Sequence, residues 1–453
     1  MKRTALVTVL LFAAAAAARA AGPGGIRALS GVPEDLWRAA EPAAPGRPQA
    51  SGPGEQKDWT IMVYLNGKND LEGAALRDLN EMERAGSTKN VNIVVEIGRI
   101  KGFDASNGDW NGVRRYYALK DRNMKLVASR LEQDLGGADM GDYRTLIDFG
   151  RWAKNLYPAK RYMLIVWNHG SGWEKRAPSN PDIAPDKGIS YDSATKNHIN
   201  TPQLGLALSA IGKVAIYASD ACLMQMPEVD YELKNYADYI IGSEETEPSG
   251  GYDYTAFLGA LGERPAMLPA ELAKLVVDSY SAQYRRSRTG STLSIVRSGA
   301  LDGLAERTAA WTSAVMAAGM RREVRDAINS AMSYDHWGNK DLYSLVELVS
   351  AKAPDAAVRG RSAELLRYIS AELVLYNRTS DQAAVDDNGD EGGGVSPKKY
   401  SGSHGIAVYL PGLKINDGYQ ELAWASASGW PEFMAWYLNK QPPVIRQAAG
   451  PRL

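Results

Sequence analysis

Apolar segments that alternate with helical ones limit most strongly what this chain can fold into. Apolar residues run almost without a break through 59–65, 91–97, 162–167, 214–218 and 239–242. The intervening segments 71–84 and 142–156 instead repeat apolar residues at helical spacing. Strands that are buried on both faces and joined by helices are typical of a mostly parallel sheet with helices on both sides. The sequence therefore predicts an α/β fold.

The second half of the chain follows a different pattern. Residues 264–375 predict several helices with one strand at 291–297. A further strand at 405–410 precedes a final helix at 432–438. We therefore expect an α/β domain over residues 58–262, followed by a mainly helical region with added strands over 263–453.

Two finer expectations concern single elements. Residues 114–119 are expected to form an edge strand. Thr201 is expected to be the N-cap of a helix that begins at Pro202, because proline favours the first helical position.

The N-terminus predicts export. Residues 1–20 combine a charged start, an apolar stretch and an Ala-x-Ala cleavage site, which together describe a secretory signal peptide. Residues 21–57 are dense in proline, glycine and alanine, and we expect a linker or a propeptide there. The expected location is secreted or periplasmic, and the alternative is a leader that remains attached as an anchor. No other apolar stretch is long enough to span a membrane.

Charge excludes some classes of partner. The formal net charge is −1, and acids and bases are interspersed along the chain. This pattern gives no basic footprint for nucleic acid or for an anionic membrane surface. We expect a monomer whose partners are proteins or peptides.

The chain contains one cysteine, Cys222. Exported proteins normally use cysteines in pairs, so an unpaired thiol is either a small buried apolar residue or a reactive group. Cys222 follows directly after the predicted buried strand at 214–218. In a parallel sheet, functional groups gather beyond the carboxyl ends of the strands. This position favours the reactive interpretation.

A histidine occupies the matching position upstream. His169 follows directly after the predicted strand at 162–167. If the two strands are parallel neighbours, the imidazole can take the proton of the Cys222 thiol and then protonate a leaving amine. The backbone N–H groups of Gly170 and Cys222 can form an oxyanion hole. No carboxylate is evidently placed to orient the imidazole, so a dyad is expected. His404 precedes its strand and is expected to take no part.

These residues and their surroundings resemble one known family. The similar segments are Asn-His-Gly at 168–170, Asp-Ala-Cys at 220–222 and the opening strand and turn at 59–72, together with 188–192, 201–204, 242–248, 251–254 and 405–411. In combination they resemble the clostripain family of cysteine peptidases, which belongs with the caspases, legumains, gingipains and metacaspases. The resemblance covers roughly residues 58–440.

The resemblance implies a caspase-like αβα sandwich around a mostly parallel sheet, with a largely helical C-terminal part. It also implies an endopeptidase with His169 as general base and acid, Cys222 as nucleophile, and Gly170 and Cys222 as oxyanion donors. Asp220 would line the S1 pocket and select Arg or Lys at P1, although a loop-capping aspartate is the alternative. Glu244 and Glu245 are weaker candidates for further negative charge in that pocket.

Two loops are candidates for regulation. Residues 174–187 contain Lys175, Arg176 and Lys187. Several members of the resembled family cut themselves after a basic residue in this region, and an ordinary surface loop is the alternative. Residues 386–394 are rich in Asp and Gly, but Glu391 and Pro397 stand where an EF-hand requires Gly and Glu. The chemistry requires no cofactor. A calcium site of another kind stays open, the favoured alternative is a solvated acidic loop, and we name no metal ligand.

Two other functions remain open. A surface-binding protein could keep this fold without activity, although His169, Cys222 and Asp220 are all present. A transpeptidase or ligase could use the same site, as legumains do. A serine hydrolase is disfavoured because no Gly-x-Ser-x-Gly motif follows a strand.

Overall fold

The structure is a computed structural model that describes residues 56–173, 188–383 and 397–440. The predicted signal peptide, nearly all of the predicted linker, and the two candidate regulatory loops lie outside these residues. Within them, no helix is both long and apolar enough to cross a membrane.

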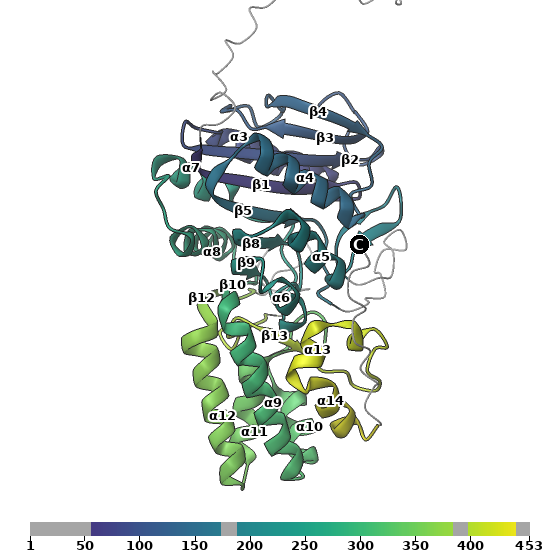
Figure 1. Cartoon of the computed structure of the whole chain (residues 1–453), viewed down its shortest axis with the longest axis vertical. Helices are drawn as coiled ribbons and strands as arrows, with labels where there is room; N and C mark the ends of the chain where they lie inside the picture. The colour runs from purple at the N-terminus through teal and green to yellow at the C-terminus, as the bar shows by residue number, and fades with distance from the viewer. Residues whose placement is uncertain (1–55, 174–187, 384–396, 441–453) are drawn as a thin grey trace, which may run out of the picture. The chain divides into compact units, whose positions relative to one another are not determined.

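A nine-stranded sheet forms the centre of the fold (Figure 1). Its strand order is β12-β10-β9-β8-β5-β1-β2-β3-β4, and the five middle strands from β9 to β2 are parallel. Those five strands are β9 (Ala237–Gly242), β8 (Val214–Asp220), β5 (Ala159–Trp167), β1 (Lys57–Gly67) and β2 (Val91–Arg99). The prediction of a mostly parallel sheet is confirmed.

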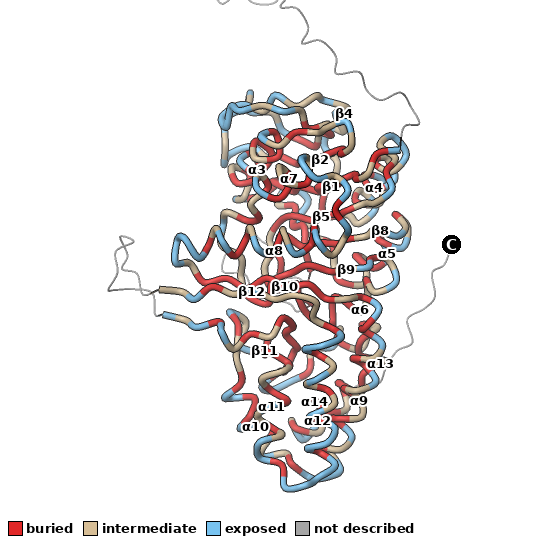
Figure 2. Tube along the Cα trace, turned by 90° about the vertical axis from the view of Figure 1, so that its left-hand side faces the viewer, coloured by how far each residue is buried: buried red, intermediate tan, exposed pale blue. Residues whose placement is uncertain are grey.

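The flanking strands are antiparallel and differ from expectation. β3 (Gly112–Tyr117) pairs with β2 on one side and with β4 (Arg130–Gly136) on the other, so the predicted edge strand is an inner strand. At the opposite edge, β10 (Ser291–Arg297) pairs with β12 (Val374–Ser380), a strand that the sequence analysis does not predict. Both outer strands are only partly buried, and Figure 2 shows β4 as largely exposed or intermediate. They therefore lack the apolar runs that mark the central strands.

Helices cover both faces of the sheet, which confirms the αβα sandwich. One face carries α3 (Glu72–Ala85), α7 (Tyr254–Glu263) and α8 (Pro269–Arg286). The other carries α4 (Tyr143–Leu156), α5 (Thr201–Ile211) and α6 (Pro227–Leu233). Strand β1 has an apolar run because alternate residues are buried on opposite faces of the sheet. Met62 and Tyr64 belong to one core, whereas Ile61 and Val63 belong to the other.

The second half adds a helical part that continues one of these two cores. It consists of α9 (Leu301–Ala317), α10 (Arg321–Ser330), α11 (Leu342–Lys352), α12 (Ala356–Tyr368), α13 (Ala423–Ser428) and α14 (Trp430–Leu438). A small antiparallel sheet of β11 (Asn339–Asp341) and β13 (Ala407–Tyr409) lies with them. Their buried residues belong to the same cluster as those of α4, α5 and α6. The helical part and that face of the sheet therefore share one core.

The start of α5 differs from expectation by one residue. Asn200, not Thr201, is the N-cap: its side chain accepts a hydrogen bond from the Gln203 backbone, and the Gln203 side chain accepts one from the Asn200 backbone. This reciprocal capping box satisfies two backbone N–H groups at once, which a threonine one position later does not do.

Candidate active site

The pairing of β5 with β8 brings the two predicted reactive residues together. The strands are parallel neighbours, and Trp167 at the end of β5 lies opposite Asp220 at the end of β8. His169 and Cys222 each follow two residues later, so they leave the sheet at matched positions on the same edge. The condition that the sequence left open, that the two strands are neighbours, is therefore met.

The two loops that carry these residues are packed backbone against backbone. A Cβ atom on Gly170 would lie 3.0 Å from the Ala221 Cβ and 3.1 Å from the Cys222 nitrogen, and it would collide with the Cys222 carbonyl oxygen. Gly172 has a φ of 62°, and a Cβ there would lie 2.7 Å from the Leu223 carbonyl oxygen. Only glycine permits this approach. The predicted oxyanion donors, Gly170 and Cys222, are thus adjacent.

The turn after the cysteine has strained backbone geometry. Leu223 has a φ of 64°, which is rare for a residue with a side chain and costs about 1 kcal/mol or more. Its N–H donates to the Glu245 carbonyl at 3.1 Å, and the Gln225 N–H donates to the Ser243 carbonyl at 3.0 Å. The segment that follows β9 therefore holds the cysteine turn in place.

The Cys222 thiol is half-buried and lies against the backbone of Glu247. The Glu247 N–H donates to Sγ at 3.2 Å, and Sγ lies 4.0 Å from the Glu247 carbonyl oxygen. An N–H group directed at sulfur stabilises negative charge on it. This environment suits a thiolate nucleophile better than an inert core cysteine.

A carboxylate that the sequence analysis missed contacts the histidine. Asp70 Oδ1 lies 2.9 Å from His169 Nε2. This hydrogen bond lowers the pKa of Asp70 below its ordinary value. Asp70 is in the turn after β1, and β1 is the parallel neighbour of β5. The expectation that no carboxylate orients the imidazole is wrong. The available signal was that Asp70 also follows a buried strand.

Asp220 is buried beside tyrosines. Its Oδ2 accepts a hydrogen bond from the Tyr254 hydroxyl at 2.8 Å and from the Tyr252 N–H at 3.3 Å. Burial raises the pKa of Asp220 to about 6. No lysine or arginine among the described residues forms an ion pair with this carboxylate. Such a group favours a cationic ligand that would compensate its buried charge.

The buried carboxylate beside Asp220 is Glu247, not one of the two predicted glutamates. Both carboxylate oxygens of Glu247 are inaccessible to solvent, and the Glu247 and Asp220 side chains are hydrogen-bonded to each other. Burial and the charge of Asp220 raise the pKa of Glu247 well above its ordinary value. Two buried acids therefore lie next to each other and close to the thiol.

Glu244 and Glu245 contact the C-terminal part of the chain instead. Glu244 accepts hydrogen bonds from the Ser403 hydroxyl at 2.7 Å and the Gly405 N–H at 2.9 Å. Glu245 forms an ion pair with Lys398 at 2.5 Å and accepts a hydrogen bond from Tyr400 at 2.9 Å. They fix the segment after β9 rather than adding charge to the pocket.

Two further acids, on α3, lie near Asp220. Asp78 accepts a hydrogen bond from the Trp167 indole at 2.7 Å. Burial, followed by the charge of Asp220, raises its pKa well above the ordinary value. Burial and Asp253 raise the pKa of Glu81 to about 7. These acids make the surroundings of Asp220 favourable for a positive charge.

The other histidines play different parts. His404 lies in the segment before β13, which belongs to the small sheet and not to the central one. Its Nδ1 lies 3.0 Å from Asp341 Oδ1, and its ring stacks on Tyr343 at 4.1 Å. His198 stacks on Tyr191 at 5.2 Å. From the sequence, His404 is expected to take no part because it precedes its strand. In the structure that strand is β13, which is not part of the central sheet at all.

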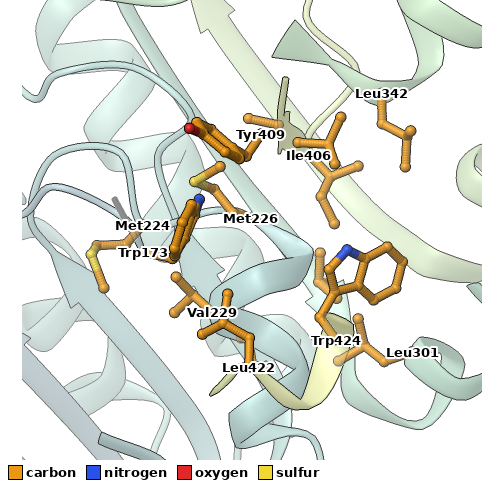
Figure 3. Packing of buried hydrophobic residues seen from close by; sticks show 14 of the residues in the cluster. Trp173, Met224, Met226, Val229, Leu301, Leu342, Ile406, Tyr409, Leu422 and Trp424 are labelled. Carbon is orange, nitrogen blue, oxygen red and sulfur yellow. The ribbon is translucent and has the colours of Figure 1, made fainter. Parts of the chain in front are cut away.

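An aromatic contact links the histidine loop to the helical part. Trp173 packs edge-on against Tyr409 at 4.9 Å and Tyr419 at 4.7 Å. Figure 3 shows Trp173 between Met224 and Met226 of the cysteine loop and Tyr409 of β13. Both loops therefore rest on the core that continues into the helices.

The described residues contain no group of three or more His, Cys, Asp or Glu side chains that could hold a metal ion. The acidic loop at 386–394 lies outside them, so calcium binding there stays a prediction.

A family model now connects this geometry to known proteins. The model of the clostripain family matches residues 63–437, which is most of the chain and includes every residue of the candidate site. The chain belongs to the clostripain family. The resemblance that the sequence motifs suggested is confirmed.

Individual relatives of the clostripain-family chain agree with this match. Clostripain from Hathewaya histolytica is 27% identical over 216 residues, which cover 43% of this chain and 40% of that protein. The chain thus spans about two fifths of the length of this curated relative.

Two solved structures share the fold. A secreted C11 cysteine protease from Bacteroides thetaiotaomicron, in complex with an irreversible peptide inhibitor, has a TM-score of 0.60 and 23% identity. An inactive zymogen C11 protease from Parabacteroides distasonis has a TM-score of 0.60 and 18% identity. Each comparison covers 83% of this chain and 99% of the solved one.

Proposed function

We propose that this clostripain-family protein is an exported cysteine endopeptidase that cleaves after Arg or Lys. The observation that carries the proposal is the matched position of His169 and Cys222 beyond paired parallel strands. The family match and the two buried acids beside the thiol support it.

The residues have distinct roles in the proposed reaction. His169 takes the proton from the Cys222 thiol, and the thiolate attacks the carbonyl carbon of the scissile bond. The N–H groups of Gly170 and Cys222 stabilise the oxyanion. His169 then protonates the leaving amine, and a thioester forms between the substrate and Cys222. Water activated by His169 hydrolyses the thioester and regenerates the thiol.

Asp220 and Glu247 provide the proposed specificity for a basic P1 side chain. A guanidinium or ammonium group beside them would compensate the charge of this buried acid pair, with which no lysine or arginine among the described residues forms an ion pair. Separating such a buried charge pair costs about 2–5 kcal/mol, which is enough to exclude neutral side chains. The tyrosine hydroxyl and N–H groups around Asp220 hold that carboxylate in place.

Single substitutions test the catalytic part of this proposal. Cys222→Ala and His169→Ala are each expected to abolish peptide cleavage, because nucleophile and base act as a unit. His404→Ala is the matched control: it removes a histidine that also contacts a carboxylate, and activity should remain. Cleavage at the wild-type rate by Cys222→Ala would contradict the mechanism.

A P1-scanning peptide library tests the specificity. The wild-type enzyme should prefer Arg and Lys, and both Asp220→Asn and Glu247→Gln should lower kcat/KM for basic P1 by more than about tenfold. Peptides with a small neutral P1 residue serve as the control on the same variants and should be affected far less. A wild-type preference for acidic or apolar P1 residues would contradict the proposal.

Export and partners complete the proposal. Residues 1–20 carry the features of a signal peptide, and the B. thetaiotaomicron structure of similar fold is described as secreted. We expect a monomer that acts on protein or peptide substrates and needs no cofactor for the chemistry.

A further inference from the structure

The contact between Asp70 and His169 lies on a rigid support. Asn69 donates a side-chain hydrogen bond to the Tyr191 carbonyl at 2.8 Å and accepts one from the Leu71 N–H at 2.9 Å. The preceding residue, Lys68, forms a buried ion pair with Asp192 at 2.7 Å. The side-chain contacts of Lys68 and Asn69 therefore hold the turn that carries Asp70.

The histidine side has a matching support. Asn168 donates to the Asn66 carbonyl at 2.6 Å and accepts from the Tyr191 N–H at 2.7 Å. The residues that precede Asp70 and His169 are thus both buried asparagines, and both contact the backbone of Tyr191. One residue of β6 (Ile189–Asp192) clamps the two turns to each other.

The hydrogen bond itself selects one nitrogen of the ring. An ionised carboxylate only accepts hydrogen bonds, so the nitrogen that faces it must carry the proton. The nitrogen that faces Asp70 is Nε2. A neutral imidazole held in this way leaves Nδ1 without a proton, as a base requires.

We propose that Asp70 is a positioning residue that keeps the His169 proton on Nε2 and leaves Nδ1 to act on the Cys222 thiol and on the leaving amine. This inference rests on the proposed peptidase function, but the tautomer of His169 is measurable without any substrate. The expected dyad of His169 and Cys222 thus gains a third residue, Asp70, which orients the His169 imidazole.

The size of the effect follows from exposure. The side chains of Asp70 and His169 are 39% and 28% exposed, so solvent weakens their interaction. Asp70→Ala is therefore expected to lower kcat by about tenfold, far less than the loss seen when a buried triad aspartate is replaced. KM should stay within about twofold, because Asp70 is assigned no contact with the substrate.

Nitrogen-15 NMR of the full-length protein with labelled histidine tests the assignment. The chain has four histidines, and a His169→Gln variant identifies the His169 signals. At a pH where the ring is neutral, wild-type His169 should have its proton on Nε2. His404 supplies an internal control, because Asp341 faces its Nδ1 and should give the opposite tautomer.

Asp70→Ala should change the tautomer ratio of His169 and leave the signals of His404 unchanged. Asp70→Asn keeps an acceptor oxygen at this position, so it should restore part of both the Nε2 tautomer and kcat. A wild-type His169 with its proton on Nδ1 would overturn the proposal, as would an Asp70→Ala variant with wild-type tautomer ratio and kcat. Failure of the proposed function would appear separately, as a wild-type protein that cleaves no peptide or as cleavage that persists in Cys222→Ala, and the tautomer of His169 would still be measurable.

Discussion

At the residue scale, three buried acids interact with one another near the Cys222 thiol. Asp220, Glu247 and Asp78 all have a raised pKa because burial disfavours their charged forms. Residues with strongly shifted pKa values cluster at the functional sites of enzymes. It also makes the proposed preference for basic substrates depend on pH.

The first prediction concerns that pH dependence. Burial raises the pKa of Asp220 to about 6, and a basic P1 residue needs the ionised form. As pH falls through about 6, Asp220 gains a proton, and kcat/KM for an Arg substrate should fall more steeply than for a neutral one. Parallel pH profiles of the two substrates measure the difference. Asp220→Asn should reduce the difference between the two profiles near pH 6; profiles that are already parallel in the wild type would contradict the assignment.

The second prediction concerns stability. Because the pKa of Asp220 is higher in the folded than in the unfolded protein, the folded state binds more protons between about pH 4 and pH 6. The Asp220 contribution to stability therefore falls as pH rises through this window, and the ionised group is destabilising above it. Asp220→Asn should increase the free energy of unfolding by about 1–3 kcal/mol at pH 8 and by much less at pH 4.

Urea unfolding of both proteins at the two pH values measures this change. An Asn side chain can still accept the hydrogen bond from the Tyr254 hydroxyl and has nearly the same size as Asp. The substitution therefore removes the charge with little change in packing. Equal effects of the substitution at pH 4 and pH 8 would show that the charge of Asp220 is not the cause.

At the element scale, close contact between two loops creates the site. Gly170→Ala should place a methyl group against the Cys222 backbone and lower kcat/KM by more than about a hundredfold, because misplacement of reacting groups by about 1 Å has effects of this size. Gly259→Ala is the matched control, since a Cβ there meets no atom within 4 Å. Retained activity in Gly170→Ala would contradict the proposed oxyanion geometry.

The elements also show what a sequence can predict. The five parallel strands are recognisable because their central residues are buried on both faces of the sheet, which favours a run of apolar residues. Strands β4 and β12 lie at the sheet edges and carry polar residues on their exposed sides, so they had no such signature. The position of β13 outside the central sheet depends on pairing with β11, which no local pattern encodes.

The same distinction applies to the site. His169 and Cys222 could be predicted because each directly follows a recognisable strand. Asp70 follows one as well, but its contact depends on which strand neighbours β5, and the sequence does not state the strand order. Glu247 could not be separated from Glu244 and Glu245, because their partners Ser403, Lys398 and Tyr400 come from more than 150 residues away.

At the scale of the whole molecule, the helical part is continuous with the site. Glu244 and Glu245 connect the segment beside the thiol to residues of the C-terminal part, and β10 extends the sheet beyond β9. A fragment of residues 56–262 would expose the edge of β9 and one side of the shared core. We predict that this fragment does not fold alone.

Circular dichroism and dye binding of the purified fragment measure this outcome. The expected result is aggregation or a state that binds hydrophobic dyes, compared with a cooperative unfolding transition for residues 56–453 prepared in the same way. A soluble, cooperatively folding fragment would show that the helical part is dispensable for the fold.

In the proposed reaction one thiol, activated by His169, attacks substrates selected by a basic P1 side chain. The most direct measurement is covalent labelling of the full-length protein with peptidyl chloromethyl ketones that differ only at P1, followed by mass spectrometry. Because the chain has one cysteine, a label on Cys222 is unambiguous. The account predicts rapid labelling of Cys222 by the Arg reagent, slow labelling by the Asp reagent, and much slower Arg labelling in His169→Ala. Labelling of another residue, or equal rates for Arg and Asp reagents, would contradict it.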